Sequence, residues 1–126
     1  MEENFVKMNI DEMKSAKEGW QTWLQVSKRL LKKIQNMDDV NRWEIKSLEM
    51  SYNLFIDQMK KIVSIYGEMI DLAEFCDLEI KEFNDGMRKI RKANAELRKE
   101  YNRKTFRELN NKYIHGIKEA EVINGL

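Results

Sequence analysis

The sequence contains no proline, one cysteine, one histidine and five glycines among its 126 residues. Without proline it lacks the residue that most often ends a helix, because the proline ring clashes with the preceding turn and has no N–H donor. A single cysteine excludes a disulfide within the chain, and one histidine leaves too few ligands for a zinc site. We therefore predict an all-α protein without a metal.

Motifs of the common enzyme classes are also missing. Histidine is the usual general base near neutral pH, but the one histidine, His115, stands near the end of the chain with no cysteine close in sequence. There is no Gly-rich phosphate loop and no Gly-x-Ser-x-Gly nucleophile motif. We expect a protein that is not an enzyme, with no catalytic residues and no cofactor.

Long hydrophobic runs are absent too. No stretch approaches about 18 uncharged apolar residues, so we expect no transmembrane segment. The acidic start Met1-Glu2-Glu3 lacks the basic and apolar regions of a signal peptide. Lysine outnumbers arginine and asparagine is frequent, which is typical of an A/T-rich genome. We expect a cytoplasmic protein from a bacterium or a phage.

What the sequence does contain is a long apolar stripe. From Ile45 to Tyr101 an apolar residue recurs alternately every three and four positions, interrupted by Asn94. This period places one stripe along an α-helix and predicts coiled-coil-like packing. Asn94 has two interpretations: a buried polar residue that selects the register of packing, or a surface residue of an exposed basic helix. A similar stripe starts after Asn9, where Glu12 has the spacing of a capping box.

Poor helix formers indicate where the helices end. The segment 36–39, Asn-Met-Asp-Asp, predicts a tight turn, and the segment 84–86, Asn-Asp-Gly, predicts a second break although the stripe passes through it in phase. Thr105 and Glu108 have capping-box spacing and suggest a further interruption.

We therefore predict one helical domain over 1–126, an elongated antiparallel hairpin or three-helix bundle. Its helices should span about 10–36, 39–84 and 87–118, with frayed ends at 1–8 and 119–126. The alternative is one continuous helix over 39–102.

The apolar stripe widens between Leu54 and Leu78 to four of every seven positions. So wide an apolar arc needs neighbours on two sides, and we expect self-association, most simply a two-fold homodimer. Cys76 lies on the stripe and should be a small buried hydrophobe. The residues predicted to form the packing and dimer core are Trp20, Trp23, Tyr52, Phe55, Met59, Ile62, Tyr66, Met69, Ile70 and Phe83.

Two features point to the surface. Trp43 falls at the outer f position of the heptad and is the tryptophan expected to meet a protein partner. Charge is also divided: residues 38–85 hold 5 basic and 12 acidic side chains, a net of −7, whereas 88–112 hold 10 and 3, a net of +7. The side chains that would contact nucleic acid are Arg88, Lys89, Arg91, Lys92, Arg98, Lys99, Arg103, Lys104 and Arg107.

These patterns favour a non-enzymatic α-helical interaction or assembly protein, an adaptor or scaffold, that works by helix packing. Nucleic-acid binding through 88–107 is the alternative, because a positive helix can neutralise phosphates. It is not favoured, since the acidic segment is of equal size and can occupy the same basic surface.

Overall fold

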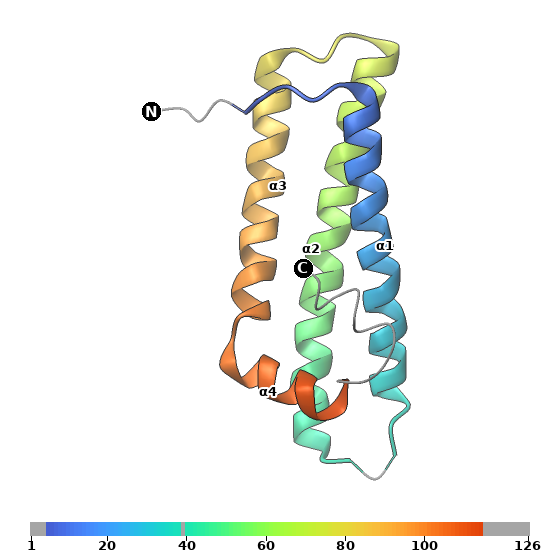
Figure 1. Cartoon of the computed structure of the whole chain (residues 1–126), viewed down its shortest axis with the longest axis vertical. Helices are drawn as coiled ribbons and strands as arrows, with labels where there is room; N and C mark the ends of the chain where they lie inside the picture. The colour runs from blue at the N-terminus through green and yellow to red at the C-terminus, as the bar shows by residue number, and fades with distance from the viewer. Residues whose placement is uncertain (1–4, 39, 115–126) are drawn as a thin grey trace.

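The chain folds into a bundle of helices, as predicted from the stripes. The computed structural model describes residues 5–38 and 40–114, and these form α1 (Ile10–Gln35), α2 (Arg42–Phe75), α3 (Ile80–Tyr101) and α4 (Lys104–Tyr113). Each of the three long helices runs antiparallel to the one before it, and α4 crosses one end of the bundle (Figure 1). The all-α fold class is confirmed.

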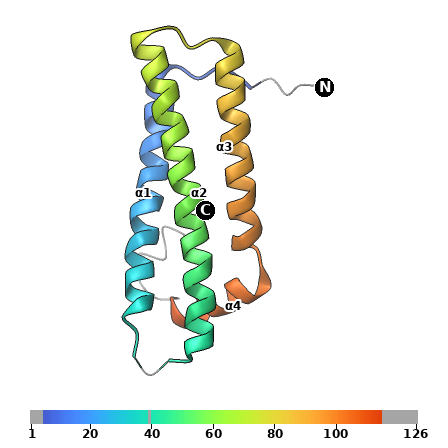
Figure 2. The same ribbon diagram turned by 180° about the vertical axis from the view of Figure 1, so that it is seen from behind.

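Helix α2 is the central element. It packs against α1 on one side and α3 on the other, whereas α1 and α3 pack mainly on α2 rather than on each other (Figure 2). Both flanks of its wide apolar arc are thus covered within one chain. The width of the arc, from which we inferred a second copy, therefore does not by itself require one.

The start of α1 forms as predicted. Asn9 Oδ1 accepts the N–H of Glu12 at 2.8 Å, and Glu12 Oε1 accepts the N–H of Asn9 at 3.1 Å, which completes the capping box. The start of α2 differs from the prediction: the helix begins at Arg42 rather than at 39. The N-cap is Asn41, whose Oδ1 accepts the N–H groups of Trp43 and Glu44.

The break between α2 and α3 was predicted at the wrong place. It lies at 76–79, and Asn84, Asp85 and Gly86 are inside α3, so both the helix over 39–84 and the continuous helix over 39–102 are wrong. Each of the three poor helix formers has a tertiary or local contact instead. Asn84 Oδ1 accepts the N–H of Phe5, and Asp85 Oδ1 pairs with Arg88 at 2.6 Å.

Gly86 has a different role, which is close packing. A Cβ added there would lie 2.6 Å from Sδ of Met69 on α2, a side chain that is 3% exposed. The missing side chain therefore lets α3 approach α2. The helix-breaking tendency of these residues is overridden because packing on α2 stabilises the helix through them.

A pair of glycine substitutions tests this close approach. Gly19 lies inside α1 with nothing within 4 Å of its would-be Cβ, so Gly19→Ala should raise the free energy of unfolding by about 1 kcal/mol. Gly86→Ala should be less stable than Gly19→Ala by about 1–3 kcal/mol, because Met69 must move. Urea denaturation measures both, and equal stabilisation by the two alanines would contradict the tight contact.

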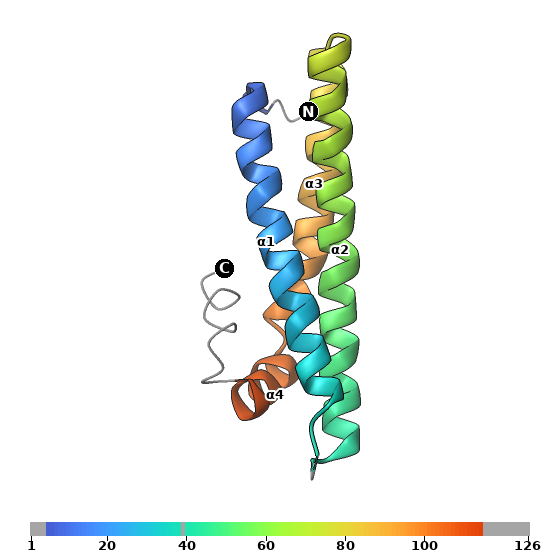
Figure 3. The ribbon, with the colours of Figure 1, turned by 90° about the vertical axis from the view of Figure 1, so that its right-hand side faces the viewer.

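The predicted third helix, 87–118, is interrupted once within the described residues. Helix α3 ends at Tyr101, and α4 begins at Lys104 after a turn at Asn102 and Arg103. The interruption expected near Thr105 is thus present slightly earlier in the chain, but the capping box of Thr105 and Glu108 is wrong, because the N-cap is Arg103 and no side chain caps this helix. Figure 3 shows α4 turned across the end of the elongated bundle. Residues 115–118 lie outside the described residues.

The turn at 76–79 also corrects the prediction for Cys76. This residue is the C-cap of α2 and is exposed, not buried, because the stripe stops being helical where it occurs. Phe75, the last residue of α2, and Ile80, the first of α3, flank this turn and are also exposed, at 79% and 65%. The apolar residue of this turn that is buried is Leu78, at 2% exposed.

The N-terminal segment crosses the same end of the bundle, from α3 to the start of α1 (Figure 1). Residues 5–8 are not helical, and Lys7 Nζ donates to the carbonyl oxygen of Leu78 at 2.8 Å. Of the two ends predicted to be frayed, 1–4 and 119–126 lie outside the described residues.

Two groups of buried side chains form the core along α2. One lies toward the α4 end of the bundle and the other toward the turn at 76–79, and α2 contributes to both. Eight of the ten residues predicted for the core are buried, while Trp20 and Trp23 are partly buried, their rings edge to face at 4.9 Å.

Candidate interaction face at the start of α2

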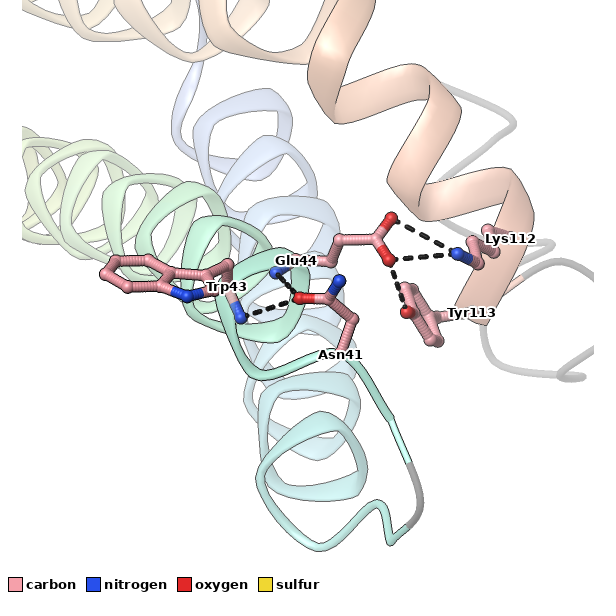
Figure 4. Close-up of polar contacts among 5 residues, drawn as sticks. All are labelled: Asn41, Trp43, Glu44, Lys112 and Tyr113. Carbon is pink, nitrogen blue, oxygen red and sulfur yellow. Dashed lines mark hydrogen bonds and ion pairs between the residues drawn. The ribbon is translucent and has the colours of Figure 1, made fainter.

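The most exposed aromatic side chain among the described residues is Trp43, in the first turn of α2. It is 86% exposed, as its f position in the heptad suggests. Figure 4 shows the Trp43 ring pointing away from α4, whereas the Glu44 side chain points toward α4. Transfer of the large apolar surface of a tryptophan ring from water into a contact is favourable. Contact with a partner would remove that ring from water, but such contact remains a prediction.

The helix turn that carries Trp43 is fixed from two directions. Asn41 caps its free N–H groups with bonds of 3.0 and 3.3 Å. Glu44 Oε1 accepts hydrogen bonds from Nζ of Lys112 at 2.9 Å and from the hydroxyl of Tyr113 at 3.0 Å, and both of these residues belong to α4 (Figure 4). The first turn of α2 is therefore capped by Asn41 and tied to α4 through the side chain of Glu44, and it carries the Trp43 ring.

We call the contacts of Glu44 with Lys112 and Tyr113 the clamp. They shift the pKa values of Glu44 and Lys112. The hydrogen bonds from Lys112 and Tyr113 lower the pKa of Glu44 below its ordinary value of 4.5, and the bond to Glu44 raises the pKa of Lys112 above 10.5. The Glu44 side chain is 27% exposed and that of Lys112 is 57% exposed. The pair is thus ionised across the neutral range, but water screens much of its attraction.

The clamp makes stability depend on pH in a defined direction. A carboxylate with a lowered pKa contributes stability that is present above its ordinary pKa of 4.5 and is lost as the pH falls through the lowered value. Glu44→Gln should therefore be less stable than wild type at neutral pH, and the difference should shrink in acid. Urea denaturation of both proteins, from neutral pH down to below the ordinary Glu44 pKa of 4.5, measures the effect. The control is Glu49→Gln, which removes a carboxylate from the same helix without touching the contacts of Glu44 with Lys112 and Tyr113.

Met50 lies two turns beyond Trp43 on the same side of α2. It is 67% exposed, and it lines a shallow groove of about 600 Å³ with the partly buried Leu54. Met50 is seven residues from Trp43 and Leu54 is four from Met50, spacings that place the three on one side of α2. We call these three apolar residues the Trp43 face; the other residues lining the groove are Asn53, Asp57, Gln58, Lys60 and Lys61. The seven-residue spacing was the signal that could have placed Met50 beside Trp43 from the sequence.

Aromatic packing beneath α4 supports the clamp. Phe106 of α4 is 1% exposed, and its ring centroid lies 5.0 Å from that of Phe55 and 5.8 Å from that of Tyr52, both on α2. The Tyr52 hydroxyl donates to Oδ1 of Asn110 at 2.7 Å. Burial raises the pKa of Tyr52 far above its ordinary value, so this hydroxyl remains a proton donor.

The basic side chains of 88–107 have different surroundings in the structure. Arg88 pairs with Asp85, Arg103 with Glu100 at 2.7 Å, and Lys104 Nζ lies 3.9 Å from Glu108. The Arg91 guanidinium lies 6.0 Å from the ring centroid of Phe5. Two others, Lys89 and Lys92, line a groove between α2 and α3. The structure thus divides the predicted nucleic-acid contacts among different surroundings.

Asn94, the polar exception on the stripe, is half-buried in α3. Its side-chain oxygen is fully buried and has no hydrogen-bond partner in the part of the chain that the structure describes. An unsatisfied buried acceptor costs free energy. Of the two interpretations, the plain surface residue therefore does not describe this side chain.

Within residues 5–38 and 40–114, no cluster of His, Cys, Asp and Glu has the size of a metal site, and no helix is long and apolar enough to cross a membrane. Comparison of the chain with protein-family models, with curated proteins and with solved structures found no match. The class of the protein is therefore defined by its fold alone, an all-α helical bundle.

Proposed function

We propose that this chain is a non-enzymatic α-helical interaction protein that assembles into a homodimer through the Trp43 face. The observation that carries the proposal is the exposure of Trp43 and Met50, at 86% and 67%, on one side of an ordered helix. Burying such side chains is the main source of affinity in protein interfaces, where tryptophan is enriched among the residues that contribute most.

A second copy is the simplest occupant of this face. In a two-fold dimer both chains use the same surface, so the exposed apolar residues of each chain are buried against the same surface of the other. The sides of α2 that face α1 and α3 are already filled. Association must therefore use an outer face, and the Trp43 face is the part of outer α2 with the most exposed apolar residues. We propose a cytoplasmic location on the sequence grounds given above.

Sedimentation equilibrium of the wild-type chain tests the proposal. The dimer should appear as the concentration rises through the micromolar range, a dissociation free energy of about 8 kcal/mol. A chain that stays monomeric at about 100 μM would exclude the homodimer. In that case the same face would have to meet a different protein.

A further inference from the structure

A second groove adjoins the one beside Met50 and shares Lys60 and Lys61 with it, but has a different lining. The groove between α2 and α3 has a volume of about 540 Å³. We call it the lysine groove, and its lining residues are Lys60, Lys61, Ser64, Ile65, Lys89, Lys92 and Ala93. Four lysine side chains therefore border one groove, two from each helix, and none of the described residues that line it is a carboxylate.

The four lysines, two on α2 and two on α3, have no partners among the described residues, whereas Arg88 and Arg91 of α3 do. No ion pair or hydrogen bond involves their side chains in the described part of the chain, although Asp57 and Glu96 lie one turn away from Lys61 and Lys92. Like charges around one groove repel each other and raise the local positive potential. A bound anion would relieve that repulsion.

The apolar base, the cationic rim and the volume of the groove indicate which class of ligand it could bind. Ala93 is buried and Ile65 is partly buried, so the base is apolar while the rim is cationic. The volume falls within the range of sites for small molecules, about 300–1,000 Å³. Lysine binds phosphate as a point charge on a flexible stem, without the fixed fork of arginine.

We propose that the lysine groove binds a small anion that carries several phosphate groups. Recognition here rests on charge from both helices rather than on backbone N–H groups, so affinity should rise with the number of charges on the ligand. It should also fall steeply with salt, because binding releases counterions and the groups are exposed to water. Inorganic tripolyphosphate should accordingly bind more tightly than pyrophosphate, and pyrophosphate more tightly than phosphate.

Calorimetric titration of the full chain with tripolyphosphate at low salt tests the proposal. Lys89→Gln/Lys92→Gln should weaken binding by about tenfold or more. The matched control is Lys28→Gln/Lys32→Gln, which removes the same charge from two exposed lysines of α1. The control should weaken binding by less than about twofold.

Three results would overturn the proposal. They are an absence of saturable tripolyphosphate binding at low salt, an equal loss in the groove and control variants, and binding of a short single-stranded DNA in place of tripolyphosphate. The third, if abolished by Lys89→Gln/Lys92→Gln, would assign the groove to a nucleic-acid backbone. Sedimentation of the groove variant keeps this test apart from dimerisation, because both substituted lysines are on α3 and neither lines the groove beside Met50.

Discussion

Phe55→Ala should lower the free energy of unfolding by about 3–5 kcal/mol. Phe55 is 1% exposed, and its ring contacts those of Tyr52, Phe106 and Tyr101 at centroid distances of 5.5, 5.0 and 6.4 Å. Removing it leaves a cavity among aromatic rings and deletes edge-to-face contacts that add to simple burial. The cost is large against the total stability of a small domain, about 5–15 kcal/mol.

This site joins three helices, which is why the effect should exceed that of an ordinary core residue. Phe55 belongs to α2, Tyr101 ends α3 and Phe106 anchors α4. Urea denaturation followed by circular dichroism measures the loss, and Asn53→Ala, an exposed change on the same helix, should stay within about 0.5 kcal/mol of wild type. A loss below about 1 kcal/mol for Phe55→Ala would mean that the aromatic group is not closely packed.

Trp43→Ala/Met50→Lys should convert the dimer to a monomer without unfolding the chain. Both side chains are exposed in the single chain, so their removal costs little folding stability. In the dimer they would be buried, and the substituted lysine would place a charge in an apolar contact. We expect the dissociation constant to rise by about a hundredfold or more, a loss of roughly 3 kcal/mol or more.

The opposite end of the bundle provides a matched control for this prediction. Phe75→Ser/Ile80→Ser removes two exposed apolar side chains of comparable exposure from the turn between α2 and α3. This variant should leave the dimer intact, because we propose that the chains associate through the Trp43 face and not through any exposed apolar side chain. If both double variants dissociated equally, the Trp43 face would have no special role.

Local periodicity predicted most of the fold. The stripe from Ile45 onward placed Tyr52, Phe55, Met59 and Ile62 in the core, and all four are buried at 1% or less. The capping box at Asn9 fixed the start of α1 in the same way. These signals succeed because helix period and capping are decided within a few residues.

The break between α2 and α3 shows where such reasoning ends. Asn84, Asp85 and Gly86 are poor helix formers, but a bond to Phe5, a pair with Arg88 and contact with Met69 keep them in α3. Two of these partners lie far away in the sequence, so their contribution cannot be seen locally. The break that the structure shows, at 76–79, contains neither a proline nor a glycine, so the sequence carries no strong local signal for it.

The candidate site was predicted in part for the same reason. The f position indicated that Trp43 would be exposed, because heptad position is a local property. The clamp on its helix was not predicted, since Glu44 and Lys112 are 68 residues apart and meet through the turn that starts α4. The lysine groove likewise combines Lys60 and Lys61 with Lys89 and Lys92, which only the packing of α2 on α3 brings together.

Sedimentation equilibrium of wild type beside Trp43→Ala/Met50→Lys tests the central claim most directly. At tens of micromolar, the account predicts a dimeric mass for wild type and a monomeric mass for the variant, with the same helical circular dichroism spectrum for both. A wild-type chain that remains monomeric, or a variant that remains dimeric, would contradict assembly through the Trp43 face.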